Sequence, residues 1–423
     1  MERTTLAPGV ALTTLPAQKF NRCRICIQFQ YGATREDATA QALLPLLLER
    51  CYAGCPDMTE LSCKLAELYG ADLSVDLIGS GANRLLTVRV SGIRDEFALE
   101  NEALTEEYAD IAFGVAFDPC LVNGSFDPEA VEIEKEKLAR QLAAEVNEKR
   151  IYCVRQARRQ FFGDKPEGIQ KDGYLDEVEG ITPEQLTAVY RTLLRTANIE
   201  VIVMGTDPEP VRQRLMKALE GVDRQPAGLI PFSAQPRQEV RRFKENMELV
   251  QAKLCMLFTA GQPSSPEELS VCRLAMSVFG GSATSRLFLN VREKQSLCYY
   301  CGSSFMLASG YMTVESGVEP ANAEKAEAAI LKELEDICNG PIADEELEDC
   351  RRGLLSGLAS VEDTMGGLEG WYSLELLRGG AVQSPAQACE ALMNVTKEQV
   401  QEFLRRMTYS VSYLVTKEGE PND

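Results

Sequence analysis

The chain of 423 residues contains no histidine. Histidine is the commonest general base, the usual partner of a nucleophilic serine or cysteine, and the commonest zinc ligand of hydrolases. Its absence therefore excludes most hydrolytic mechanisms. Carboxylate, lysine, tyrosine or thiolate chemistry remains open, and a role in binding is favoured over one in catalysis.

Long apolar stretches are also missing. The first 22 residues have no continuous apolar core of the kind that a signal peptide requires, and no later stretch reaches the length of a transmembrane helix. Positive charge is scarce, since 44 Lys and Arg residues face 64 Asp and Glu residues and give a formal net charge of -20. This balance opposes attraction to nucleic acid or to an anionic membrane. We therefore expect a cytoplasmic protein that binds neither.

Cysteine, by contrast, is plentiful, with 14 residues. In a long chain without a signal sequence, we expect reduced thiols in the cores. Two Cys-x-x-Cys pairs, Cys23/Cys26 and Cys298/Cys301, lie in segments of strand character, where residues three apart face opposite sides of a sheet. That geometry is poor for a shared metal, so packing is predicted for both pairs. Three further cysteines have better spacing for a metal but no fourth ligand: Cys51, Cys55 and Cys63.

The chain repeats itself. Residues 24–32 align with 253–261 at an offset of 229, and in each copy a strand-like run ends at a glycine and leads into an apolar helical run. Residues 181–186 align with 395–400 at an offset of 214, and both look like helix starts capped by threonine. These repeats predict an α+β fold of two homologous halves, each a mostly antiparallel sheet packed against helices.

A stretch rich in proline and polar residues separates the two halves. It predicts an extended linker over residues 222–240. The N-terminal domain then covers residues 1–221 and the C-terminal domain residues 241–423, each of a plausible size for a domain.

The most specific motif is the run 280–299, GGSATSRLFLNVREKQSLCY. Together with the duplicated halves and the linker, it resembles the pitrilysin/insulinase family of zinc metallopeptidases, and the resemblance covers nearly the whole chain. It is closest to a bacterial branch that lacks the metal site, is encoded beside a zinc-bearing relative and is linked to modification of elongation factor P. The resemblance implies the duplicated fold of the mitochondrial processing peptidases.

In active members of that family, an inverted motif, His-x-x-Glu-His, supplies two zinc ligands from one helical face and a glutamate that activates the metal-bound water. Here Leu46 and Arg50 stand at the histidine positions, and only Glu49 of the motif remains. We expect Leu46 to restore an apolar face and Arg50 to pair with an acid, and we predict no bound zinc and no other cofactor. The family's third ligand is a glutamate of a later helix, where three residues are candidates that otherwise form a solvated acidic face: Glu132, Glu134 and Glu136.

Active members also use an arginine and a tyrosine of the second half to hold the substrate main chain, and Arg292 and Tyr299 match that pair. A guanidinium donates a fixed fork of hydrogen bonds to a peptide carbonyl, and a phenol can donate to the same oxygen. The residues alone leave open that Arg292 pairs with an acid and Tyr299 packs in a strand, and Tyr300 leaves the tyrosine assignment open by one position. A preceding loop borders the cleft in the family and offers a secondary site: Gly280, Gly281, Ser285 and Arg286.

These features predict a catalytically inactive peptidase homologue that acts as the non-catalytic, substrate-holding subunit of a complex with an active zinc-bearing relative. A heterodimer is expected, with a homodimer as the other possibility, and the substrate would be a peptide or protein. One alternative is a stand-alone protein that binds extended peptides at a sheet edge without cleaving them. Another is a non-zinc enzyme that uses the Cys51 thiol or the Glu49 carboxylate, although no histidine is present to activate a thiol.

Overall fold

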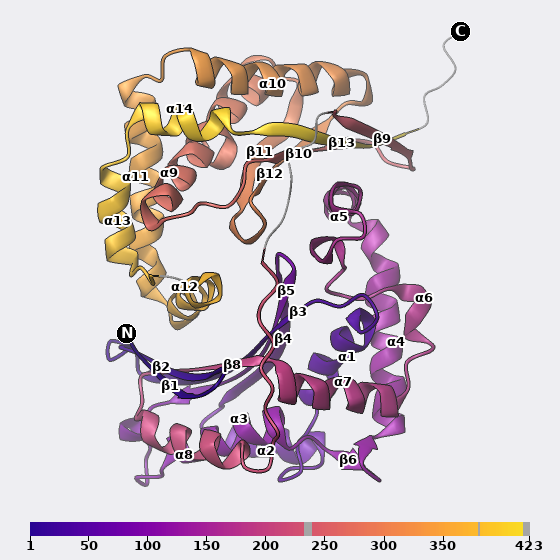
Figure 1. The fold of residues 1–423 in the computed structure, drawn as a ribbon, viewed down its shortest axis with the longest axis vertical. Coiled ribbons are helices and arrows are strands. Elements are labelled where there is room, and N and C mark those ends of the chain that lie inside the picture. Colours follow the sequence, from indigo (N-terminus) through magenta and orange to yellow (C-terminus); the bar gives the residue numbers. More distant parts are fainter. Residues whose placement is uncertain (232–238, 380, 418–423) are drawn as a thin grey trace. The chain divides into compact units, whose positions relative to one another are not determined.

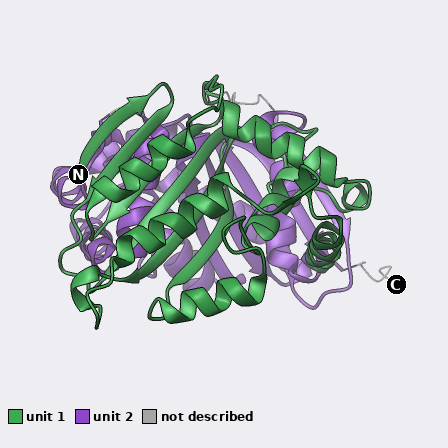
Figure 2. Cartoon of the chain, turned by 90° about the horizontal axis from the view of Figure 1, so that it is seen from below, with its two compact units in different colours: residues 1–144, 169–231 green, residues 145–168, 232–423 purple. Residues whose placement is uncertain are grey.

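A computed structural model describes residues 1–231, 239–379 and 381–417 of the chain (Figure 1). The chain forms two compact units, which are coloured separately in Figure 2. The first comprises residues 1–144 and 169–231, and the second comprises residues 145–168 and 232–423 as far as these are described. None of the helices in the described residues is long and apolar enough to cross a membrane.

The first unit has, in its described residues, a six-stranded sheet of order β1-β2-β8-β3-β5-β4. Strands β2 and β8 run parallel, and all other neighbouring pairs are antiparallel. The central strand β3 is hydrogen-bonded on both sides, which fits its almost unbroken run of buried residues. In sheet order the strands are β1 Glu2–Ala7, β2 Val10–Leu15, β8 Asn198–Met204, β3 Arg22–Gly32, β5 Asn83–Ile93 and β4 Asp72–Ser80.

The core of the first unit lies between this sheet and its helices, above all α1, α3 and α7. Helix α7 begins with the side chain of Thr182, which accepts a hydrogen bond from the Gln185 N–H, as its sequence predicts. The helices and the small hairpin of this unit are α1 Ala38–Leu48, α2 Met58–Glu67, α3 Leu104–Phe117, β6 Leu121–Val122, β7 Ser125–Phe126, α4 Pro128–Ala144, α6 Leu175–Val178, α7 Pro183–Thr196 and α8 Pro208–Ala218.

The second unit has, as far as it is described, a five-stranded sheet of order β11-β12-β10-β13-β9, in which only β13 and β9 run parallel. The strands are β11 Cys298–Met306, β12 Tyr311–Val318, β10 Ala252–Thr259, β13 Thr408–Thr416 and β9 Arg241–Asn246. The helices are α5 Lys149–Phe162, α9 Pro266–Met276, α10 Ala323–Asn339, α11 Asp344–Ser360, α12 Met365–Arg378, α13 Pro385–Met393 and α14 Lys397–Arg405, with π-helical turns at Ser277–Gly281 and Leu287–Lys294.

The internal duplication is confirmed by the two sheets. The order β2-β8-β3-β5-β4 of the first sheet recurs as β9-β13-β10-β12-β11 in the second, with the parallel pair at the same place. The repeated segment 24–32 lies in β3, and its copy at 253–261 contains most of β10. The mostly antiparallel α+β fold predicted from the sequence is therefore correct.

Helix α5 packs with the second unit, although the predicted division at 1–221 places it in the first half. Its apolar residues Cys153, Ala157, Phe161 and Phe162 cover a face of the second sheet formed by alternate residues of β10 and β13 and by Tyr311 of β12. The other face of that sheet packs on the helices of the second unit, including α9, α10 and α14. Both faces are thus buried, which explains why β10 reads as a nearly continuous apolar run.

The predicted linker 222–240 falls partly outside the described residues, at 232–238. Its first part, 222–231, contains no helix or strand. Backbone N–H groups of Gln225 and Ala227 donate to carbonyls at the end of α7, and Ile230 exchanges two hydrogen bonds with the Asn83 side chain. This extended segment is therefore held on the first unit.

Candidate functional site: a degenerate zinc motif and an arginine–tyrosine concavity

The degenerate motif lies at the C-terminal end of α1. The helix is nearly all buried and ends at Leu48, so that Glu49 and Arg50 follow on its last turn. Leu46 is half-buried and packs against the core of the first unit. An isobutyl side chain therefore lies where a zinc peptidase needs an imidazole, and it offers no metal ligand.

Arg50 pairs with Glu134 of α4. Its Nη1 donates to the Glu134 Oε1 over 2.7 Å, and the two side chains are 20% and 6% exposed. The Lys137 ammonium lies 3.5 Å from the other Glu134 oxygen. The guanidinium thus supplies positive charge at close range to a buried carboxylate, which would otherwise have only the more distant Lys137 ammonium as an ion-pair partner.

Glu134 is the candidate for the third-ligand position that the structure brings to the motif. Glu132 is exposed and forms an ion pair with Lys135, and Glu136 is exposed. In α4 the buried residues Val131, Glu134, Lys135 and Leu138 share one helical face by their spacing. This periodicity is a signal in the sequence that could have selected Glu134.

The residues at this site do not fit zinc. Two histidine positions hold an apolar and a cationic side chain, and the one buried carboxylate is already engaged by the cation. Across the described residues, no group of three or more Cys, Asp or Glu side chains is placed to hold a metal ion.

Glu49, the remaining motif residue, is exposed beside the edge strand β4. Partial desolvation raises the pKa of its carboxyl, and the nearby Asp76 of β4 raises it further, while Lys137 lowers it. The carboxyl is thus easier to protonate than an ordinary glutamate. In the described structure, Glu49 forms no hydrogen bond or ion pair with Arg50, because the Arg50 guanidinium pairs with Glu134.

In the second unit, Arg292 and Tyr299 lie together. The Arg292 Nε donates to the Tyr299 carbonyl over 3.0 Å, and its guanidinium lies over the Phe288 ring at 4.5 Å. The Tyr299 residue is 59% exposed. Both line a concavity of about 410 Å³, together with Glu293, Ser296, Leu297, Cys298 and Glu319.

The neighbouring Tyr300 has a different environment. Its ring lies under the Arg150 guanidinium at 4.6 Å and near the Lys253 ammonium at 5.5 Å, and it contacts Gly317 closely enough that a Cβ there would clash. Burial raises the pKa of Tyr300 well above its ordinary value. Of the two tyrosines, Tyr299 is therefore the one whose side chain is available at the concavity.

The secondary loop is held mainly by internal contacts. Ser285 is fully buried, and its hydroxyl donates to the Ser282 carbonyl over 2.6 Å. Arg286 forms a two-pronged ion pair with Glu346 and also donates to the Pro341 carbonyl. A Cβ on Gly280 would lie 2.7 Å from the Ser303 backbone nitrogen, so this glycine permits the loop to approach β11. These contacts give Ser285 and Arg286 a structural role and leave little capacity for a ligand.

The cysteine pairs behave differently from one another. Cys23 belongs to the core of the first unit, and Cys26 is buried outside that cluster, as expected for residues three apart in a regular strand. The expectation of opposite faces is wrong for Cys298 and Cys301, because β11 has a register shift between Cys298 and Tyr300. Both thiols therefore join the core of the second unit.

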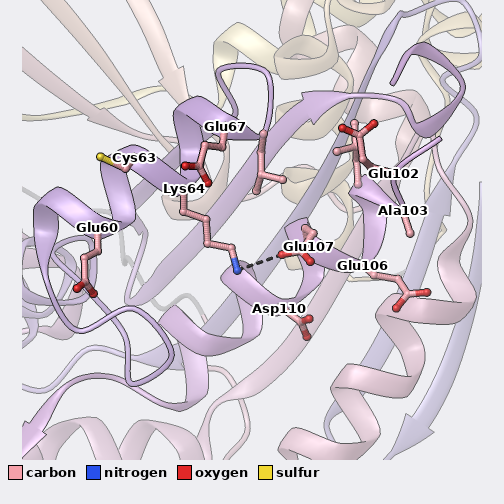
Figure 3. Close-up of a pocket in the computed structure, with 11 residues that line it drawn as sticks. Glu60, Cys63, Lys64, Glu67, Glu102, Ala103, Glu106, Glu107 and Asp110 are labelled. Atoms are coloured by element: carbon pink, nitrogen blue, oxygen red, sulfur yellow. Dashed lines mark ion pairs between the residues drawn. The ribbon is translucent and has the colours of Figure 1, made fainter. Parts of the chain in front are cut away.

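The loop thiols show no metal cluster either. Cys51 lies near Cys120, whose pKa is raised to about 12, first by burial and then by the neighbouring Cys51 thiol. Cys63 is exposed on α2. It lines a second concavity of about 690 Å³ between α2 and α3, where Lys64 and Glu107 form an ion pair at 3.0 Å (Figure 3). This acidic concavity could not be predicted from the sequence, because its carboxylates come from two separated segments: Glu60, Glu67, Glu102, Glu106, Glu107 and Asp110.

Comparison with known proteins agrees with this geometry. The family described as "Peptidase M16 inactive domain" matches residues 180–354. A Bacillus subtilis protein named "Probable inactive metalloprotease YmfF" is 24% identical over 409 residues, which cover 96% of each chain. The chain is thus similar to inactive proteins of the M16 peptidase family. This likeness agrees with Leu46 and Arg50, which supply no zinc ligand at the two histidine positions of the motif.

Solved structures with a similar fold cover the whole length of the chain. A conserved protein from Enterococcus faecalis is 25% identical, with a TM-score of 0.90, and the match covers 100% of this chain and 99% of that one. A peptidase M16 inactive domain from Pseudomonas fluorescens has the same fold at 18% identity, with a TM-score of 0.78 over 100% and 99% of the two chains.

Proposed function

We propose that this M16 homologue is the non-catalytic, substrate-holding subunit of a complex with an active, zinc-bearing relative. The observation that carries the proposal is the contrast between the two units. In the first unit, Arg50 neutralises Glu134 where a metal would be bound. In the second, Arg292 and Tyr299 remain at an open concavity, with Tyr299 59% exposed.

The contacts of Arg292 leave its guanidinium able to donate hydrogen bonds to a substrate. Its Nε donates to a backbone carbonyl, and its nearest acid is Glu293, with an Nη1–Oε1 distance of 3.4 Å between partly exposed side chains. Exposed pairs of this kind contribute about 0–1 kcal/mol, so a peptide carbonyl can replace the acid at small cost. The Tyr299 hydroxyl adds a second donor on the same concave surface.

The proposal is tested by measuring peptidase activity with a quenched fluorescent peptide mixture. The purified chain, its zinc-bearing relative from the same organism, and the mixture of both are compared, with metal content measured in each. We expect activity in the mixture to exceed that of the separate proteins, and Arg292→Ala or Tyr299→Phe to reduce it at least about tenfold, the loss expected for one transition-state hydrogen bond donor.

Two matched variants control for unspecific effects. Tyr300→Phe removes a hydroxyl from the adjacent, packed tyrosine, and Arg352→Ala removes a guanidinium that is 78% exposed on α11. Both should retain the activity of the mixture. Equal activity in the mixture and in the relative alone would contradict the subunit role.

A stand-alone peptide-binding protein is the second candidate, favoured by the free edge of the first sheet. Strand β4 has a neighbour on one side only in the described structure, and Asp76 of this strand lies near Glu49. An extended peptide could add to such an edge through main-chain hydrogen bonds. Binding of a labelled peptide by the isolated chain, unchanged by Arg292→Ala, would favour this role over the arginine–tyrosine concavity.

A further inference from the structure

The start of β11 brings two thiols together. In the pairing with β12, Cys298 lies opposite Val318 and Tyr300 lies opposite the adjacent Gly317, so Tyr299 is an extra residue in β11. Such a bulge reverses the alternation of side chains beyond it. Cys298 and Cys301 consequently face the same side of the sheet, where a regular strand would separate them.

The two thiols belong to one core cluster, and one of them borders solvent. Cys301 lies opposite Ser316 of β12, whose hydroxyl donates to the Tyr300 carbonyl over 3.1 Å. Cys298 and Cys301 are 8% and 7% exposed, and Cys298 lines the concavity that contains Arg292. A small reagent in the concavity can therefore meet Cys298 first, with Cys301 directly behind it.

The surroundings also divide the chemical roles. The neighbouring Cys301 thiol and the Arg292 charge lower the pKa of Cys298 to about 7, although burial opposes this. The neighbouring Cys298 thiol and burial raise the pKa of Cys301 far above its ordinary value. Cys298, which lines the concavity beside Arg292, is thus the thiol of the pair placed to react as a thiolate.

We propose that Cys298 and Cys301 are a redox-active dithiol, which closes to an intramolecular disulfide by exchange with a low-molecular-weight disulfide of the glutathione type. The Cys298 thiolate attacks one sulfur of the reagent, whose S–S bond breaks and releases the first thiolate, which takes up a proton. Cys301 then loses its proton and attacks the Cys298 sulfur, and the second reagent thiolate leaves. Two protein thiols are oxidised, and one reagent disulfide is reduced to two thiols.

Other cysteines of the chain lack this combination of contact, access and thiolate character. Burial raises the pKa of Cys153 and of Cys272 to about 12, and neither lines a described concavity. The Cys51–Cys120 contact raises the pKa of Cys120 to about 12. Cys63 is exposed but has no thiol partner among the contacts of the described residues, so it serves as a reference for unassisted reactivity.

Trypsin offers a direct assay, since cleavage after Lys294 and Lys325 gives a peptide whose only cysteines are Cys298 and Cys301. The full chain is incubated with oxidised glutathione, quenched by alkylation and digested. We expect the wild-type peptide to lose two hydrogens. In Cys301→Ser the peptide should carry one glutathione on Cys298, and in Cys298→Ser its modification should fall at least about tenfold, as expected for loss of the thiolate.

The assignment is overturned if the wild-type peptide stays reduced while Cys63 becomes glutathionylated. It is also overturned if Cys298→Ser and Cys301→Ser are modified at equal rates. Alanine variants at both positions, checked by circular dichroism, distinguish a lost thiol from a disturbed fold. The wild-type peptide decides the assignment even if a variant does not fold.

A consequence for Tyr299 rests on the proposed function. A disulfide requires the two Cα atoms to lie within about 7 Å, so its closure would draw the bulge together and displace the Tyr299 carbonyl that Arg292 holds. We expect oxidation to lower the activity of the mixture at least about threefold, and Cys301→Ala to abolish this sensitivity. Activity that is absent even under reduction would contradict the subunit role, whereas the peptide assay tests the dithiol independently.

Discussion

Replacing Arg50 by methionine should destabilise the first unit by about 3 kcal/mol, because the change leaves Glu134 buried without its guanidinium partner. Methionine preserves most of the length of the aliphatic stem of arginine and removes the charge. The effect should therefore report the ion pair and not a lost volume. If the Arg50 guanidinium compensates the Glu134 charge in place of a metal ion, its removal should lower the free energy of unfolding of the first unit.

The magnitude follows from the geometry of the pair. The Nη1–Oε1 distance is 2.7 Å, and the Glu134 side chain is only 6% exposed. Two unit charges about 4 Å apart at an effective dielectric constant of about 20 attract by about 4 kcal/mol, while an unpaired buried partner costs about 3–5 kcal/mol. Lys137 stays 3.5 Å from the other Glu134 oxygen, so the lower end of that range applies.

A double-mutant cycle separates this interaction from other effects. Arg50→Met, Glu134→Gln and the double variant are compared with the wild type by hydrogen exchange of α1 and α4, since the single tryptophan, Trp371, lies in the second unit. We expect a coupling free energy of about 2 kcal/mol and a double variant more stable than Arg50→Met. The exposed pair of Arg352 is the control, and coupling below about 0.5 kcal/mol at Arg50 would refute the reasoning.

Three further predictions follow from single contacts. Leu46→His with Arg50→His should create a His₂Glu site that binds one zinc ion per chain, measured by metal analysis after dialysis, and adding Glu134→Gln should abolish it. Phe161→Ala should cost about 3 kcal/mol because its ring is buried between α5 and the second sheet, and faster hydrogen exchange in β10 would reveal the loss. Because the pKa of Glu49 is raised in the folded state, stability falls as pH rises from the unfolded pKa through the folded pKa. Glu49→Gln should therefore raise the thermal unfolding temperature at pH 7. The variant and the wild type should unfold at similar temperatures below about pH 4, where the carboxyl is protonated in both states.

The duplicated fold could be predicted because the repeat is carried by the strands at the centre of each sheet. Segments 24–32 and 253–261 occupy β3 and β10, whose pairing on both sides demands apolar, strand-like sequence in each copy. The threonine caps at Thr182 and Thr396 are local signals that depend on neighbouring backbone N–H groups alone. Such features do not depend on distant parts of the chain.

The position of α5 could not be predicted in this way. Its apolar face, with Cys153 and Phe161, shows that the helix must pack on something, but an amphipathic pattern does not identify which sheet it covers. The same limit applies to Cys298 and Cys301. Their spacing predicts opposite faces, and the extra residue Tyr299 that reverses this is defined by pairing with β12, a strand further along the chain.

The site is best understood from what each unit does with its charged groups. A carboxylate as buried as Glu134 is costly unless a cation accompanies it, so replacing a metal-binding histidine with an arginine removes the metal and stabilises the carboxylate in one step. Arg292 has no comparable buried acid partner among the described residues. It contacts a backbone carbonyl, the face of a ring and an exposed acid. A protein that had become only a scaffold would gain stability by pairing Arg292 with a buried acid and covering Tyr299. The open concavity with its exposed Tyr299 is therefore the feature that supports the proposed substrate-holding role over a purely structural one.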